Sequence, residues 1–182
     1  MKVSFTFVAG PGAKTPPPNA RSHSREEVNE VLKYLASTML SEDRKTLKVQ
    51  PASEFKDKPW WYFPLMGALT YTFTFPTFEL LEWLKERMGD KKFIEVGAGR
   101  GLLGLNLGIP TTDSFDALRP EARATFLSNF MAPPESFPGV ERLEALDAVY
   151  KYKPYGVLMS WPLRKRPNSI GGIDFKRLHY LT

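Results

Sequence analysis

The chain has 182 residues, a formal net charge of +5 and no cysteine. This length favours one domain with a real core, and 42 % hydrophobic residues with 13 % aromatics argue against wholesale disorder. The absence of cysteine excludes disulfides, thiolate metal sites and cysteine nucleophiles. Because the sequence shows neither a signal-peptide pattern nor an apolar run approaching the roughly 20 residues of a membrane span, we expect a cytoplasmic protein with no membrane partner.

The positive charge is concentrated near the C-terminus. Residues 151–177 contain seven lysines or arginines and one aspartate, whereas the rest of the chain is close to neutral. Such a segment can attract nucleic acid or an anionic substrate, and it can also be a solvated surface that aids solubility. The sequence leaves both readings open.

Four elements are predicted in the N-terminal part of the chain. Alternating apolar and polar residues predict a half-buried strand at residues 2–8, followed by a proline-rich loop. The capping-box spacing from Ser24 to Glu27 and an apolar stripe at helical period predict a helix. The stripe consists of Val28, Val31, Leu32, Leu35, Met39 and Leu40. Residues 46–49 fit a short strand, and residues 69–75 fit a strand or extended chain because Thr, Tyr and Phe dominate them.

Helices and strands alternate along the rest of the chain. Thr77 is the expected N-cap of a helix that ends at Gly89-Asp90. Further helices are predicted at residues 102–107 and 121–129, and strands at residues 92–96, 109–113, 143–148 and 155–160. This order predicts an α/β fold with a mostly parallel sheet and helices on both faces. Residues 1–76 would form an N-terminal α+β extension packed on a core formed by residues 77–182.

The most informative stretch follows the strand at residues 92–96. Glu95 comes just before a bend that contains Gly97, Gly99 and Gly101, and an apolar segment able to start a helix follows directly. Glycines permit a positive φ and leave no Cβ between the main chain and a ligand. The pattern therefore predicts a site for a nucleoside cofactor at the end of this strand.

From this acidic residue with alternating glycines onward, the chain resembles the class I S-adenosylmethionine-dependent methyltransferases, a family with a Rossmann-like fold. The resemblance covers about residues 77–162, with a trimmed core. It implies that Glu95 and the three glycines hold the cofactor, S-adenosylmethionine. It also implies that Asp113 meets the ribose hydroxyls and that Asp147 and Ala148 flank the adenine.

The same resemblance places Ser160 and Trp161 at the methyl acceptor. Ser160 would accept a hydrogen bond from the target group, although the order Ser-Trp-Pro-Leu departs from the family's usual motif. The implied activity is methyl transfer to nitrogen or oxygen of a nucleic acid or a small anionic acceptor. The alternative is a catalytically inactive protein of this fold that acts by binding nucleic acid or a protein partner.

Other readings of the glycine-rich segments stay open. Residues 99–104 also fit G-x-G-x-x-G, but no clear acidic residue ends a second strand about 20 residues later, as a dinucleotide site requires. The glycines can also form a turn with no ligand. The loop at Gly10-Pro11-Gly12 lacks the spacing of a phosphate-binding loop. His23 and His179 have no partners in the sequence that would make a metal site, so no metal is expected.

Overall fold

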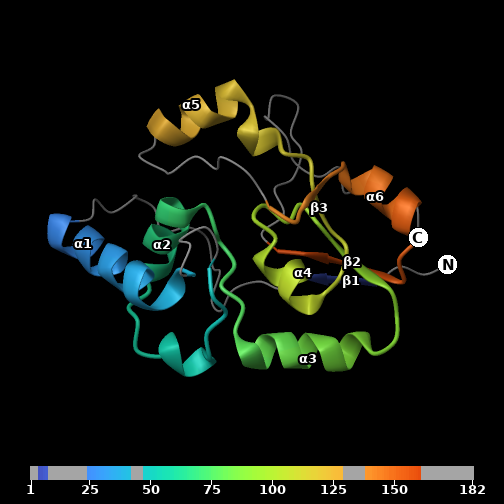
Figure 1. Cartoon of the computed structure of the whole chain (residues 1–182), viewed down its shortest axis with the longest axis horizontal. Coiled ribbons are helices and arrows are strands. Elements are labelled where there is room, and N and C mark those ends of the chain that lie inside the picture. Colours follow the sequence, from blue (N-terminus) through green and yellow to red (C-terminus); the bar gives the residue numbers. More distant parts are fainter. Residues whose placement is uncertain (1–3, 8–23, 42–46, 129–137, 161–182) are drawn as a thin grey trace.

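The computed structural model describes residues 4–7, 24–41, 47–128 and 138–160. Within these residues, five strands form one sheet in the order β1-β5-β2-β3-β4, and every neighbouring pair is parallel (Figure 1). The strands are β1 (Ser4–Phe7), β2 (Phe93–Val96), β3 (Thr111–Asp113), β4 (Glu141–Arg142) and β5 (Gly156–Met159). The expected α/β fold with a parallel sheet is confirmed.

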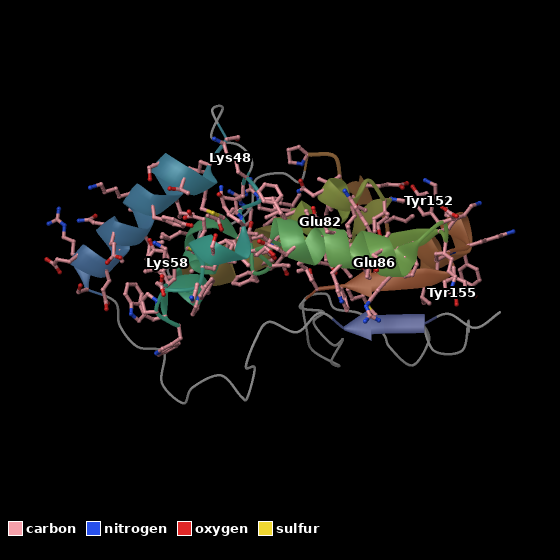
Figure 2. All side chains as sticks on the ribbon, turned by 90° about the horizontal axis from the view of Figure 1, so that it is seen from below. Lys48, Lys58, Glu82, Glu86, Tyr152 and Tyr155 are labelled. Carbon is pink, nitrogen blue, oxygen red and sulfur yellow. The ribbon has the colours of Figure 1, made fainter. Side chains whose placement is uncertain are left out.

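Helices cover both faces of this sheet. On one face, α3 (Phe78–Met88) and α4 (Leu102–Leu107) pack leucines and Met88 against Leu158 of β5. On the other face, α6 (Ala145–Tyr152) packs Ala148 against Ile94, Val96, Val157 and Met159. Alternate residues of β2 and β5 thus enter separate apolar clusters, as buried central strands of a parallel sheet require. The outer face of α3 carries the exposed Glu82 and Glu86 (Figure 2).

The first strand of the chain completes one edge of the sheet. β1 runs beside β5, with Ser4 opposite Gly156 and Phe7 opposite Met159. A strand is therefore confirmed within residues 2–8, and the N-terminal extension contributes directly to the sheet of the core. The strand that comes first in the chain thus forms one edge of the sheet.

A helical unit lies to one side of the sheet and has a core of its own (Figure 1). It consists of α1 (Arg25–Tyr34), a π-helical turn (Leu35–Met39), a 3₁₀ turn (Ala52–Glu54) and α2 (Tyr62–Thr70). Val31, Leu35, Tyr62 and Met66 are among its buried residues, and Leu102 of α4 packs against them. The predicted capping box is confirmed, because Ser24 accepts the N–H of Glu27 and Glu27 accepts the N–H of Ser24.

Three further predicted strands do not form within the described residues. Residues 69–75, predicted as a strand or extended chain, begin as the last turn of α2 and continue from Thr72 without regular secondary structure. The helix α2 places Tyr62, Leu65 and Met66 on one buried face at helical spacing. Residues 143–148 include the start of α6. This stretch is too short for its apolar residues to show the helical period. Within residues 46–49, Leu47 forms only an isolated bridge to Leu40, and Thr46 lies outside the described residues.

The remaining helix is α5 (Pro120–Ser128), which follows a 3₁₀ turn at Asp116–Leu118 and confirms the helix predicted at residues 121–129. The proline-rich loop predicted after residues 2–8 lies outside the described residues. None of the helices in the described part of the chain is long and apolar enough to cross a membrane.

Candidate functional site

The strand order places a switch point between β2 and β5. The chain leaves β2 for β3 on one side and, after β4, returns to β5 on the other side of β2. In open α/β sheets the crevice outside the carboxyl ends of two such strands is where ligands bind. The glycine bend follows β2 and Ser160 follows β5. The topology alone therefore brings the bend and Ser160 to the carboxyl ends of β2 and β5, and we use the word crevice for this position.

The three glycines of the bend all adopt the left-handed conformation that the sequence predicted. Their φ angles are +62° at Gly97, +56° at Gly99 and +71° at Gly101. A Cβ on Gly101 would lie 2.6 Å from Cγ2 of Val140, so packing also demands glycine there. Among the described residues, no atom would lie within 4 Å of a Cβ on Gly99. Gly99 is therefore the place where bare main chain faces open space.

Glu95 is turned under the bend. Its side chain is only 1 % exposed, and its Oε2 accepts the N–H of Gly104, 2.7 Å away, in the first turn of α4. The N-cap of α4 is Gly101, which has no side chain to cap the helix, so Glu95 supplies that acceptor from β2. Burial raises the pKa of Glu95 to about 7. Glu95 therefore stabilises the start of α4, directly after the bend, and has almost no exposed surface with which to contact a ligand.

Asp113, at the end of β3, holds the bend from the side. Its Oδ2 accepts the N–H of Gly99 and its Oδ1 accepts the N–H of Phe115, each at 2.8 Å. The carboxyl is partly buried, and this burial raises its pKa. Each carboxylate oxygen has two lone-pair sites, so Asp113 keeps capacity to accept further hydrogen bonds.

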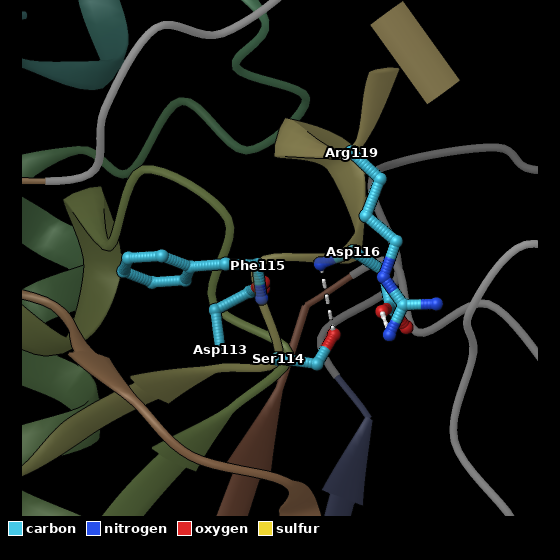
Figure 3. A network of polar contacts seen from close by, with 5 residues as sticks. All are labelled: Asp113, Ser114, Phe115, Asp116 and Arg119. Carbon is cyan, nitrogen blue, oxygen red and sulfur yellow. Dashed lines mark hydrogen bonds and ion pairs between the residues drawn. The ribbon is translucent and has the colours of Figure 1, made fainter. Parts of the chain in front are cut away.

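Two residues in a strained backbone conformation flank this carboxylate. Tyr71 and Phe115 have φ of +52° and +63°, values that bulky side chains rarely adopt. Burial raises the pKa of Tyr71 to about 12, and the negative charge of Asp113 adds to this effect. Figure 3 shows Phe115 directed away from the ion pair of Asp116 and Arg119, which closes the turn after β3. Strained conformations of this kind cluster at ligand sites.

Arg100, inside the glycine bend, links the bend to the helical unit. Its guanidinium donates to the carbonyl of Thr70, 3.4 Å away, at the end of α2. Burial lowers its pKa. Neither Arg100 nor Phe115 was identified from the sequence. The position of Arg100 between two glycines of the predicted site could have indicated it as a site residue. No sequence pattern predicted the positive φ of Phe115.

Ser160 lies where the sequence placed it, after β5. Its hydroxyl donates to Oε1 of Glu95 across 3.5 Å, so it joins the end of β5 to the support of the bend. Trp161 lies outside the described residues, and so does most of the basic segment 151–177. Within the described part of that segment, Lys151 pairs with Glu141 at the end of α6.

Asp147 and Ala148 lie in α6, away from a strand end. Asp147 is exposed in the first turn of the helix, whereas Ala148 is 0 % exposed in the core beneath it. The reason is the helical register, since neighbouring residues of a helix point about 100° apart. Ala148 therefore has no surface with which to flank an adenine, and we leave it out of the candidate site.

The aromatic residues before α3 do not form one wall. Tyr62 is a core residue at 1 % exposed, whereas Trp60 is 60 % exposed. Trp61 and Phe75 pack against the core of the helical unit. Tyr71, which follows α2, has an electrostatic interaction with Asp113.

Compared with known proteins, the chain matches no family model, no curated sequence and no solved structure.

Proposed function

We propose that this protein binds S-adenosylmethionine in the crevice between the carboxyl ends of β2 and β5 and is built on a trimmed methyltransferase-like core. The observation that carries the proposal is the geometry of Gly99. Its φ is positive, its N–H donates to Asp113, and the described part of the chain leaves open the space where a side chain would stand. A nucleoside can therefore approach this main chain closely.

The residues at the crevice suit the cofactor in part. Asp113 can accept hydrogen bonds from paired ribose hydroxyls with the lone pairs that Gly99 and Phe115 leave free. Glu95 holds the start of α4 in place by accepting the N–H of Gly104, and in this proposal it does not contact the cofactor. Asp147 stays a candidate for the adenine amino group, because it is exposed at the start of a helix that packs on β2 and β3.

The acceptor that we propose is nitrogen or oxygen of a nucleic acid or of a small anionic molecule. The cofactor supplies an already activated sulfonium methyl, so the protein's part is to hold the acceptor in line. Ser160 is the residue at the crevice that can accept a hydrogen bond from an acceptor's amino or hydroxyl group. The basic segment 151–177 supplies the attraction for an anion.

A second candidate function is binding without catalysis, with nucleic acid or a protein as the partner. One observation favours it. The carboxylates of Glu95 and Asp113 both accept main-chain N–H groups of the bend or of α4, so each already has a structural role. In that case the crevice would keep its shape, and the partner would be held by the basic segment.

Calorimetric titration with S-adenosylmethionine, its demethylated product and NAD separates these functions. We expect the first two to bind, and Gly99→Asp to weaken them at least tenfold by placing a charged side chain in the open space. Gly108→Asp is the matched control, because Gly108 has a φ of +71°, nothing within 4 Å of its Cβ position, and lies at the far end of α4. Equal affinities for the two variants would contradict the assignment of the site.

Transfer of a labelled methyl group then decides between the enzyme and the binding protein. Labelled product on RNA, DNA or a small anionic acceptor, lost in Gly99→Asp, supports the enzyme. Cofactor binding with no transfer to any of them supports the binding function. Binding of NAD in place of S-adenosylmethionine would overturn the proposal and favour a dinucleotide site.

A further inference from the structure

A buried carboxyl group connects the two strands that border the crevice. Glu95 of β2 uses its two oxygens for different partners: Oε2 accepts the N–H of Gly104 at 2.7 Å, and Oε1 faces the hydroxyl of Ser160 at 3.5 Å. The first partner can only donate, whereas a serine hydroxyl can donate or accept. The two oxygens of Glu95 are therefore not equivalent: Oε2 has a partner that only donates, whereas Oε1 has a partner that can donate or accept.

The fixed donor decides where a proton on Glu95 would sit. Because the Gly104 N–H occupies Oε2, a protonated Glu95 carries its proton on Oε1, the oxygen that faces Ser160. Ser160 must then accept from Glu95, and its own hydrogen is free to turn elsewhere. When Glu95 is ionised, the hydroxyl donates to Oε1 and presents its lone pairs outward.

We propose that Glu95 determines whether Ser160 acts as an acceptor or as a donor toward the crevice. With Glu95 ionised, Ser160 accepts a hydrogen bond from an amino or hydroxyl group of a bound molecule. With Glu95 protonated, Ser160 donates to a carbonyl or phosphate oxygen. Glu95 is thus a positioning residue that acts through Ser160, and its relevance to the acceptor rests on the proposed function.

The surroundings of Glu95 place the change near neutral pH. Burial raises its pKa to about 7, the charge of Asp113 on β3 adds to this, and the hydrogen bonds from Gly104 and Ser160 oppose it. Neither α4 nor β5 carries a charged residue. Asp147 and Lys151 of α6 are exposed, and Arg100 of the bend donates to Thr70.

The first experiment needs no ligand. In protein labelled with ¹³C at the glutamate carboxyl, the Glu95 signal is assigned by its loss in Glu95→Gln and followed by NMR against pH. We expect its midpoint near neutrality, and a shift to higher pH in Ser160→Ala, because the hydroxyl stabilises the ionised form. Ser114→Ala is the matched control, since Ser114 follows the neighbouring strand and accepts the N–H of Asp116.

This titration decides the proposal. A Glu95 midpoint at the ordinary value for glutamate, or one that Ser160→Ala leaves in place, would overturn it. An equal shift in Ser160→Ala and Ser114→Ala would also overturn it, since that would show a general effect of the loops. A shift confined to Ser160→Ala supports the link even if S-adenosylmethionine fails to bind, a result that would contradict only the proposed function.

A second experiment reads the direction of the hydrogen bond. Cytidine carries an amino group where uridine carries a carbonyl oxygen, so we measure both affinities at pH 6 and pH 8 with the demethylated cofactor present. We expect the preference for cytidine to rise about tenfold between these pH values, the factor that one mispaired hydrogen bond produces. Glu95→Gln donates permanently to Ser160 and should remove that rise, and a rise that persists in this variant would contradict the proposal.

Discussion

Within the glycine bend, neighbouring glycines are required for different physical reasons. Gly101 has a positive φ and is also enclosed, because a Cβ there would approach Val140 to 2.6 Å and Thr111 to 3.0 Å. Gly99 has a positive φ and open space. The sequence pattern treats these positions as equivalent. The structure assigns Gly101 to the packing of the bend and leaves Gly99 for a ligand.

Substituting alanine at Gly101 tests this difference. Gly101→Ala should lose about 1–2 kcal/mol through the left-handed conformation and a further 1–3 kcal/mol through overpacking against Val140. Gly108→Ala, at the same φ of +71° and without a neighbour within 4 Å, should lose only the first part. Urea denaturation measures both free energies of unfolding. Equal losses for the two variants would show that the bend is not closely packed at Gly101.

Glu95 is the residue whose charge state matters most for stability. Its pKa is raised from an ordinary 4.5 to about 7, so the folded protein binds a proton more readily than the unfolded chain between these values. Stability from this group is therefore fully present below pH 4.5 and is lost as pH rises through 7. The corresponding free energy is about 3 kcal/mol.

Glu95→Gln should flatten this dependence. We expect the wild type to lose up to about 3 kcal/mol more than the variant between pH 4.5 and pH 8, because glutamine does not ionise. Chemical denaturation of both proteins at each pH measures the difference, in which the other titrating groups largely cancel. Parallel stability curves would mean that Glu95 is ionised and solvated across the whole range.

At the scale of elements, the two helices that begin with a side-chain hydrogen-bonded cap were both predicted, whereas two helices without such a cap were missed. Ser24 and Thr77 accept main-chain N–H groups at the starts of α1 and α3, and both helices lie where the sequence placed them. In contrast, the N-caps of α2 and α6 are Trp61 and Glu144, and neither side chain makes a capping hydrogen bond. Without a start signal, no helix was predicted at residues 62–68, and the first residues of α6 were predicted to form a strand.

The capping box of α1 gives the test at this scale. Ser24→Ala removes the acceptor for the N–H of Glu27 and should lower the free energy of unfolding by about 1 kcal/mol. Ser37→Ala is the control on the same helical segment, because its exposed hydroxyl only contacts Tyr34 and Thr38. We expect that control to change stability by less than about 0.5 kcal/mol. Similar losses for both variants would mean that the box contributes nothing to the fold.

At the scale of the whole molecule, the alternation of elements predicted the parallel sheet, while the strand order came only from the structure. The short connection between Gly101 and Asp113 is explained by an α4 of only six residues. No local pattern in the sequence predicted that β1 lies beside β5. Non-local pairing of this kind depends on tertiary contacts that periodicity does not encode.

In the candidate site, too, some features could be predicted from the sequence and others could not. The positive φ of the three glycines and the places of Asp113 and Ser160 at strand ends were predictable from residue type and spacing. The direction of Glu95, under the bend instead of toward a ligand, depends on the unfilled N-cap at Gly101. The burial of Ala148 depends on the register of a helix that the sequence did not reveal.

The most direct test of the central claim follows the main-chain amides of the ¹⁵N-labelled protein by NMR while the demethylated cofactor is added. We predict that the signals of Gly97, Gly99, Gly101 and Ser160 shift together with one saturating affinity, while that of Gly108, at the far end of α4, stays in place. Shifts confined to other parts of the chain, or none at a cofactor concentration in the millimolar range, would contradict a nucleoside site at the switch point between β2 and β5.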